Sequence, residues 1–570
     1  MRLPKPITRV FPVAVLVAAA LAGGVATEAT AAPPCQVTYT IVNQWSTGFQ
    51  AAVNVTNNAA PVTSWTLAFQ FPNTQQVTNG WNAVWSQSGP QVTAGNAAWN
   101  GNLGTGQTAG LGFVGTWSGS NDLPTYFTLN GAACNGVAQR PTVNLTAPAP
   151  NAIYTAPASV PLAATAASTS GGTIAQVQFF DGTTLLGTDT TSPYALNATL
   201  AAGSHTLFAR ALDSTGATAD SAVVSVFVRR AGSSGAPALH VTGNRLVDAA
   251  GNTVVLHGVN RSGAEFQCVH GFGIFDGPMD ATSVTAIASW NVNAVRVPLN
   301  EDCWLGLANV QPQFAGANYQ TAIKDYVALL HQYGIVAILD LHWSDGVYSG
   351  NSSACTDATA TCQKPMPDSA HAVDFWRSVA TTFAGDPGTV FDLFNEPYPD
   401  RATSTLTQAW TCWRDGGTCP GIAYSVAGMQ TLINAIRAAG AQNVILLGGL
   451  AYSNDMTQWL QFKPTDSAGN LVASWHSYNF NICVSSTCWD QQIAPVAAQV
   501  PLVAGEIGEN DCAHGYIDTL MTWLDQHSIS YLGWTWNTWP CNSGPALITA
   551  YDGTPTPFGI GLRDHLRALP

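Results

Sequence analysis

The stretch Val390-Phe391-Asp392-Leu393-Phe394-Asn395-Glu396-Pro397 decides the fold of this chain. Its first five residues are apolar apart from one carboxylate, which is typical of a strand covered on both faces. An amide, a carboxylate and a proline follow, and the residue before a proline is pushed toward extended or turn conformations. We therefore expect a buried strand whose end places Glu396 at the mouth of a pocket.

Glutamate is rare in this sequence. The chain has six Glu among 570 residues, and one of them, Glu28, lies in the expected signal peptide. Glutamate is therefore not used to fill the surface, and each remaining one is a candidate for chemistry. These are Glu265, Glu301, Glu396, Glu506 and Glu509.

A second acid repeats the pattern of Glu396. Residues 500–505 form a short apolar run that is followed by Glu506, and Gly508 comes two residues later. Two carboxylates at strand ends are what the hydrolysis of a glycosidic bond requires. We expect Glu396 and Glu506 to act as a pair.

The region around these acids, residues 238–570, alternates short apolar strands with helical segments such as residues 322–333 and 517–527. This alternation is typical of a parallel sheet, and eight strand–helix units favour a (β/α)8 barrel, whose chemistry lies at the carboxyl ends of the strands. The strands are expected at residues 254–259, 294–298, 335–341, 390–394, 444–448, 471–475, 502–505 and 529–536.

Polar and aromatic residues gather at the ends of these expected strands. A single histidine is more often structural than catalytic, but a common position at one rim favours one site. The set consists of Arg296, His342, Asn395, Glu396, His476, Tyr478, Glu506, Trp534 and Trp536.

The first block of the chain, residues 33–139, is almost free of charge. Asp122 is its single charged residue, and short runs of alternating polarity predict an antiparallel β-sandwich. Trp45, Trp81 and Trp99 each lie beside turn formers, where a side chain reaches solvent. Flat exposed indoles suit the apolar faces of sugar rings, so we expect these three to bind a polysaccharide.

The second block, residues 140–231, contains neither Cys nor Trp. Its short strand-like runs, separated by turns that contain glycine, predict a small β-sandwich with no site of its own. A short linker at residues 232–237 leads into the barrel region.

The N-terminus, residues 1–32, has the features of a secretory signal peptide. Three basic residues precede an apolar run from Val10 to Ala22, and Ala29-Thr30-Ala31 supplies small residues for cleavage. We expect a secreted, extracellular protein and a monomer. The formal charge is −14, so nucleic acid or an anionic membrane surface is not expected as a partner.

Twelve cysteines follow the signal, which predicts disulfides in an oxidising compartment. No metal motif with paired Cys or His is present, so we expect no metal and no cofactor. Three bonds are favoured because their cysteines are close in the sequence, and a fourth because its two cysteines open and close the first block. The four remaining cysteines form the last two pairs. Spacing alone does not prove this connectivity. The expected pairs are Cys355 with Cys362, Cys412 with Cys419, Cys483 with Cys488, Cys35 with Cys134, Cys268 with Cys303 and Cys512 with Cys541.

The barrel region resembles glycoside hydrolase family 5. The resemblance rests on six short motifs in barrel order, at residues 295–298, 340–342, 395–397, 476–478, 505–508 and 534–536. One departure is Ile507, where the family more often has Phe. Insertions that carry cysteines, at residues 351–363, 411–421 and 482–489, lengthen loops at the rim.

The resemblance implies a retaining mechanism with Glu506 as nucleophile and Glu396 as acid and base. It also implies that Asn395 binds the sugar 2-hydroxyl and that Trp536 forms the floor on which the reacting sugar stacks. The other expected substrate-binding residues are Arg296, His342, His476 and Tyr478.

The two preceding blocks have resemblances of their own. Residues 35–134 resemble a family 2 cellulose-binding module, in which Trp45, Trp81 and Trp99 would form the binding strip. Residues 140–231 resemble bacterial immunoglobulin-like spacer domains.

The sequence thus predicts an endo-β-1,4-glucanase anchored to cellulose. A β-1,4-mannanase or a xyloglucanase stays open, because those enzymes share the rim motifs. A carbohydrate-binding protein with an inactive barrel is the alternative outside the enzymes, but it would require loss of one of the two glutamates.

Overall fold

The structure is a computed structural model that describes residues 33–135, 140–169, 173–214, 216–229, 235–350, 355–542 and 544–569. These residues form two compact units, which divide between Arg140 and Pro141. The expected signal peptide lies outside the described residues, as does part of the expected linker.

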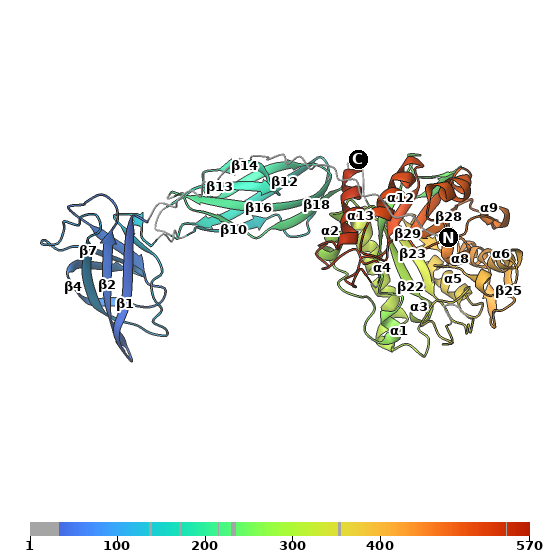
Figure 1. The fold of residues 1–570 in the computed structure, drawn as a ribbon, viewed down its shortest axis with the longest axis horizontal. Coiled ribbons are helices and arrows are strands. Elements are labelled where there is room, and N and C mark those ends of the chain that lie inside the picture. Colours follow the sequence, from blue (N-terminus) through green and yellow to red (C-terminus); the bar gives the residue numbers. More distant parts are fainter. Residues whose placement is uncertain are drawn as a thin grey trace, which may run out of the picture. The chain divides into compact units, whose positions relative to one another are not determined.

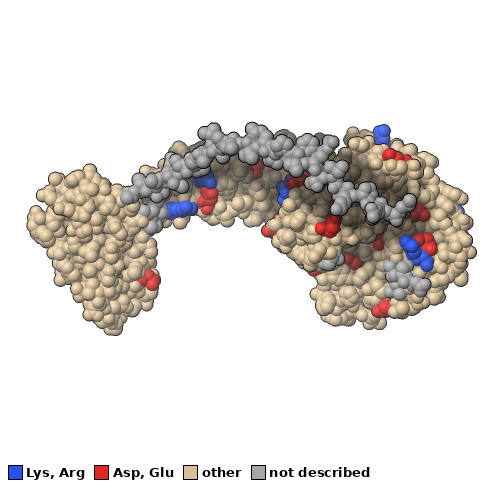
Figure 2. All heavy atoms as spheres, in the orientation of Figure 1, with Lys and Arg blue, Asp and Glu red and all other residues tan. Residues whose placement is uncertain are grey.

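The first unit is a β-sandwich of two antiparallel sheets (Figure 1). Alternate residues of its strands point into one apolar core, which contains Phe49, Trp65 and Phe113. One sheet is β1 (Cys35–Trp45), β2 (Gly48–Asn57), β7 (Thr108–Thr116) and β4 (Gln76–Trp81). The other is β5 (Ala83–Ser88), β6 (Gln91–Asn96), β3 (Thr66–Gln70), β8 (Phe127–Leu129) and β9 (Ala132–Ala133). Figure 2 shows hardly any charged side chain on the visible face of this unit.

The second unit begins with another β-sandwich, whose core contains Val160, Phe179 and Val226. Its smaller sheet is β10 (Thr142–Ala147), β12 (Ala158–Ala167) and β15 (Tyr194–Leu200). Its larger sheet is β11 (Ile153–Thr155), β18 (Val224–Arg229), β16 (Gly203–Asp213), β13 (Ile174–Asp181) and β14 (Thr184–Asp189), with β17 (Thr218–Asp220) paired to β16.

The rest of the second unit is a closed barrel of eight parallel strands, so the predicted fold class is confirmed. All eight predicted strands are barrel strands, with ends that differ by a few residues. In order they are β21 (His257–Asn260), β22 (Ala294–Asn300), β23 (Val336–Trp343), β24 (Thr389–Asp392), β27 (Ile445–Gly448), β28 (Leu471–Tyr478), β29 (Leu502–Gly508) and β30 (Ser530–Gly533).

Alternation along the barrel strands explains how the site is built. In β23, Val336 and Ile338 belong to one apolar cluster together with residues from the other strands, whereas Ala337 and Leu339 pack in the cluster that includes the helices. Successive strand residues point to opposite faces, so Asp340 and His342 share the face of Ile338. One face of β23 therefore carries apolar side chains at the beginning of the strand and the ionisable side chains of Asp340 and His342 at its carboxyl end.

Helices and short strands surround the barrel. Within the described ranges, none of the helices combines the length and apolar character needed to cross a bilayer. The longer helices are α2 (Ala281–Ala288), α4 (Ala317–Gln332), α5 (Ala372–Phe383), α6 (Leu406–Asp415), α7 (Met429–Ala438), α12 (Gly515–Gln526) and α13 (Pro557–Ala568). The shorter elements are β19 (His240–Thr242), β20 (Arg245–Val247), α1 (Gln267–His270), α3 (Glu301–Leu305), β25 (Gly416–Thr418), β26 (Ser425–Ala427), α8 (Leu450–Ser453), α9 (Trp459–Phe462), α10 (Ser486–Cys488) and α11 (Ala494–Ala497).

All twelve cysteines are joined in disulfide bonds. The bonds are Cys35–Cys134, Cys268–Cys303, Cys355–Cys362, Cys412–Cys419, Cys483–Cys488 and Cys512–Cys541. These are the pairs that were expected from the sequence. Three of them close short loops in the cysteine-bearing insertions of the barrel rim.

Candidate active site

Arg296 is the centre of the candidate site. It lies in β22 and is fully buried. Its Nη1 donates to Glu506 Oε1 at 2.8 Å, and its Nη2 donates to Asn395 Oδ1 at 2.9 Å. One guanidinium therefore orients groups from two of the predicted motifs at once.

Two buried aspartates surround the same guanidinium. Arg296 Nε donates to Asp392 Oδ2 at 2.9 Å, and Nη2 lies 3.0 Å from Asp340 Oδ1. Burial raises the pKa of each of these aspartates to about 7, although the positive charge of Arg296 opposes that shift. Asp340 belongs to one of the six motifs and Asp392 to the predicted strand before another, but neither was predicted to belong to the site.

Glu506 is a buried residue of β29, 3% exposed, and both of its oxygens accept hydrogen bonds. Oε1 accepts from Arg296, and Oε2 accepts from the Tyr478 hydroxyl at 2.5 Å. Both donors, Arg296 and Tyr478, are among the residues that the sequence analysis expected at this rim. Together they fix its orientation at the barrel rim.

Glu396 has a different environment. Burial raises its pKa to about 7, so the carboxyl group keeps its proton to a higher pH than an ordinary glutamate. His476 Nδ1 lies 3.0 Å from Glu396 Oε1, and burial lowers the pKa of His476 to about 3, so this ring is neutral. Unlike the buried Glu506, the Glu396 side chain retains 19% exposure.

The two glutamates are close neighbours. One carboxylate oxygen of Glu396, one of Glu506 and a ring nitrogen of His476 all lie within 4.8 Å of one another. Carboxyl groups this close match the shorter separation known for one class of glycosidases, about 5 to 5.5 Å, rather than the wider one of about 6.5 to 9.5 Å. The arrangement offers a proton donor on one side and an oriented carboxylate on the other.

His342 lies at the same rim. Its Nδ1 is 2.6 Å from Asp340 Oδ2, and burial lowers its pKa, so the ring is neutral. The ring stacks against Trp534, with centroids 5.4 Å apart and planes 13° apart. Asp340 and Trp534 thus hold a neutral imidazole in a fixed orientation.

The expectation for Trp536 is wrong. Its side chain is fully buried and packs edge-on against Trp290, with ring centroids 4.7 Å apart. A ring inside the core cannot form the floor for a sugar. Trp534, two residues earlier, is half-buried and stacks beside His342, so its ring is better placed at this rim than that of Trp536.

Besides Asp340 and Asp392, two more residues of the site were not predicted. Asn260, at the end of β21, accepts from Arg296 Nη1 at 3.1 Å, and its position at a strand end was a usable signal. Gln363 lies in a rim insertion, where its Oε1 accepts from Asn395 Nδ2 at 3.1 Å and its Nε2 donates to the Glu396 carbonyl at 2.9 Å. No periodicity marks a residue in such a loop.

In the first unit, Trp45, Trp81 and Trp99 are exposed, by 45%, 37% and 73%. Trp45 ends β1 and Trp81 ends β4, so both belong to one sheet. The Trp45 ring covers Gly48 and the Trp81 ring covers Gly112, where a Cβ atom would collide with the indole. Because these two positions are glycine, the rings can lie close against the sheet.

Comparison with known families gives three matches along the chain. A family model described as cellulase (glycosyl hydrolase family 5) matches residues 247–539, which is more than half of the chain. A cellulose binding domain matches residues 35–134, and a bacterial Ig domain matches residues 141–209.

Among curated proteins, endoglucanase CelA of Streptomyces lividans is 54% identical over 118 residues, which are 20% of this chain and 25% of that protein. Exoglucanase A of Cellulomonas fimi is 48% identical over 118 residues, 20% of this chain and 13% of that protein. The matches to these relatives lie in the cellulose-binding region, and the chain spans a quarter or less of their length.

Among solved structures, a beta-glucanase from Saccharophagus degradans, SdGluc5_26A, is 20% identical with a TM-score of 0.44, covering 58% of this chain and 93% of that one. A beta-mannanase from Streptomyces thermolilacinus is 20% identical with a TM-score of 0.40, covering 55% of this chain and 91% of that one.

Proposed function

Since the chain belongs to glycosyl hydrolase family 5, the cellulase family, we propose that it is a secreted, retaining endo-β-1,4-glucanase. The observation that carries the proposal is the pair Glu396 and Glu506, whose carboxylates lie within 4.8 Å at the rim of the barrel in two different environments. The chain also carries a cellulose-binding domain, which favours a glucan as the polymer that is cut.

In the first step, Glu506 attacks the anomeric carbon while Glu396 gives its proton to the leaving glycosidic oxygen. The hydrogen bonds from Arg296 and Tyr478 aim Glu506 at that carbon. The raised pKa of Glu396 keeps a proton available near neutral pH. The glycosidic C–O bond breaks, and the sugar becomes bound to Glu506 as an ester.

In the second step, water replaces Glu506 at the anomeric carbon. Glu396, now ionised, takes a proton from that water, and Glu506 leaves as a carboxylate. Attack occurs twice from opposite faces, so the anomeric configuration is retained. Asn395, which Arg296 and Gln363 hold between them, is the residue we assign to the sugar 2-hydroxyl.

The test of this proposal is a comparison of substrates under one set of conditions. The full chain is incubated with carboxymethylcellulose, mannan and xyloglucan, and both viscosity and reducing ends are followed. An endo-glucanase cuts inside the polymer, so the viscosity of carboxymethylcellulose should fall quickly while few new reducing ends are formed. Faster cleavage of mannan or xyloglucan would overturn the substrate assignment and leave the mechanism intact.

The alkaline side of the pH profile is expected to report Glu396. The protonated form of this residue is the active one, so kcat/KM should fall as the pH rises through about 7 and should fall about tenfold per unit beyond that. The measurement is kcat/KM on a soluble oligosaccharide between pH 4 and 10. With an activated aryl glycoside, whose leaving group needs no proton, the fall should disappear. If kcat/KM for the aryl glycoside still falls at alkaline pH, a group other than Glu396 causes the fall.

Substitution of the two neighbouring tryptophans is expected to separate binding from folding. Trp534→Ala removes the half-buried ring beside His342 and should raise KM by about tenfold or more, with a smaller loss of stability than Trp536→Ala. Trp536→Ala opens a cavity beside Trp290 and should cost about 3 kcal/mol of stability or more. Thermal unfolding and steady-state kinetics on each variant check this. The reverse pattern would restore Trp536 as the stacking residue.

A further inference from the structure

A second group of carboxylates lies beside the barrel rim, apart from Glu396 and Glu506. Glu301 and Asp302 follow β22, Asp345 follows β23, and Asp368 lies just before α5. The side chains of Glu301 and Asp302 are fully buried, and Asp368 is 3% exposed. Buried carboxylates normally pair with a cation, so their common location requires an explanation.

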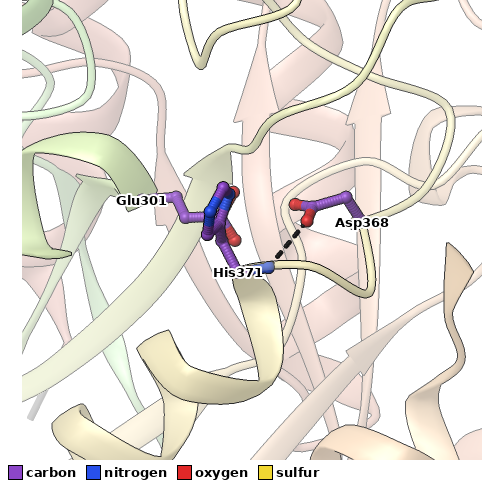
Figure 3. Close-up of side chains that lie close together, drawn as sticks. All are labelled: Glu301, Asp368 and His371. Carbon is purple, nitrogen blue, oxygen red and sulfur yellow. Dashed lines mark hydrogen bonds between the residues drawn. The ribbon is translucent and has the colours of Figure 1, made fainter. Parts of the chain in front are cut away.

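The side-chain atoms of this group are close enough to share one ion. Ligand atoms of Glu301, Asp302 and Asp345 lie within 4.8 Å of one another, and so do those of Glu301, Asp368 and His371. The two triads have Glu301 in common. Figure 3 shows the Asp368 carboxylate turned toward the side chains of His371 and Glu301.

One oxygen of each carboxylate already has a role in the protein. Glu301 Oε2 accepts from the Asp345 backbone N–H at 2.9 Å, and Asp302 Oδ2 accepts from Asn309 and from the Ala360 backbone. Asp368 Oδ1 accepts from the backbone N–H groups of Ala370 and His371, and Asp345 Oδ2 lies 2.9 Å from His371 Nδ1. These bonds fix the directions of the carboxylates.

The second oxygen of each carboxylate is buried and meets another carboxyl group instead of a donor: Glu301 lies against Asp368, and Asp345 lies against Asp302. Glu301 Oε1, Asp302 Oδ1, Asp345 Oδ1 and Asp368 Oδ2 have no hydrogen-bond partner among the residues that the structure describes. The nearby buried Lys364 does not satisfy them, because its ammonium group donates to the carbonyl oxygens of Asp357 and Thr359. Lys364 is therefore a nearby positive charge, but it makes no hydrogen bond to these four carboxylates.

We propose that Glu301, Asp302, Asp345 and Asp368 bind one hard divalent cation of the calcium class. Carboxylate oxygens are the donors that Ca²⁺ prefers, and its coordination number of six to eight leaves room for bidentate binding and water. His371 orients Asp345 through Nδ1. This site differs from the sequence expectation of no metal, which rested on cysteine and histidine motifs.

The proposed ion lies next to the loop that supports the active site. Ala360 donates to Asp302, and three residues later Gln363 contacts both Asn395 and the Glu396 carbonyl. An ion that holds Asp302, Asp345 and Asp368 together would join both ends of this loop to the barrel. Its loss should loosen Gln363 and with it the position of Asn395.

The test uses the full chain and metal salts alone. Protein dialysed against EDTA and then against metal-free buffer is titrated with CaCl2, MgCl2 and MnCl2 by calorimetry, and its melting temperature is measured with and without each salt. We expect one Ca²⁺ per chain. The melting temperature should rise by about 5 °C when free Ca²⁺ is a hundredfold above Kd.

Two variants locate the response. Asp368→Asn and Glu301→Gln should lose Ca²⁺ binding and the Ca²⁺-dependent rise, while the exposed Asp374→Asn in α5 should keep both. If either site variant fails to fold, the titration of the wild-type chain still decides. If the wild-type chain shows neither Ca²⁺ binding nor a shift in melting temperature, the proposal is wrong. Protons shared between the carboxyl groups would then explain the cluster. Tighter binding of Mn²⁺ than of Ca²⁺ overturns the calcium class.

Discussion

Glu506→Ala is expected to lose hydrolysis by about 10⁴-fold or more, because this residue forms the bond to the anomeric carbon. Its environment offers no substitute, since Arg296 and Tyr478 can donate hydrogen bonds there but cannot attack. Added azide could enter only from the vacated face and would give the inverted α-glycosyl azide. The measurement is turnover with and without azide, with the product identified by proton NMR.

Glu396→Ala is expected to fail in a different way. A substrate whose leaving group needs no protonation should still form the ester with Glu506, and azide should then replace the water that Glu396 normally activates. The product is the β-glycosyl azide, with the configuration retained. A control on soluble substrate with Asp374→Asn should match the wild type. Near-normal turnover of Glu506→Ala without azide, or an inverted first product from the wild type, would refute the assignment of both residues.

The second large effect is expected in the first unit. Replacement of Trp45, Trp81 and Trp99 by Ala removes the three exposed indoles and should abolish binding to insoluble cellulose. Activity on a soluble substrate should survive, because these residues are in the other compact unit. A pull-down with microcrystalline cellulose measures the binding. The variant Leu123→Ala, which removes an exposed apolar side chain from the same unit, is the matched control.

Salt distinguishes stacking from attraction between charges. Asp122 is the single charged residue between residues 33 and 139, so the wild-type pull-down should be unchanged between low salt and 1 M NaCl. Cellulose binding that persists in the triple variant would show that another surface carries it. A strong dependence on salt would show that charge does.

The architecture could be predicted because each of its signals is periodic. Short apolar runs gave all eight barrel strands, and the scarcity of glutamate directed attention to Glu396 and Glu506. The scarcity of glutamate also made Glu301 a candidate. The proposed role of Glu301 in binding a cation, however, requires Asp302, Asp345 and Asp368 beside it. Aspartate is common in this chain, and nothing in its spacing shows that these three converge.

The errors have a physical origin as well. Trp534 and Trp536 lie at the end of the last strand, and the sequence alone does not show which ring enters the core against Trp290. Gln363 lies in a rim loop whose path is set by a disulfide bond and by Asp302, neither of which leaves a periodic trace. Strand ends can be read from apolar runs, but loop contacts depend on the folded chain.

The near absence of charged residues in the first unit also limits where trypsin can cleave this protein. Trypsin cuts after Lys or Arg, and between Arg9 and Arg210 the one such residue is Arg140, which Pro141 follows and thereby protects. The cellulose-binding sandwich and most of the next domain therefore offer trypsin no site, folded or unfolded. The bond between Cys35 and Cys134 lies wholly inside that fragment, so mapping it requires a protease of another specificity, such as one that cuts at Asp122 or at aromatic residues.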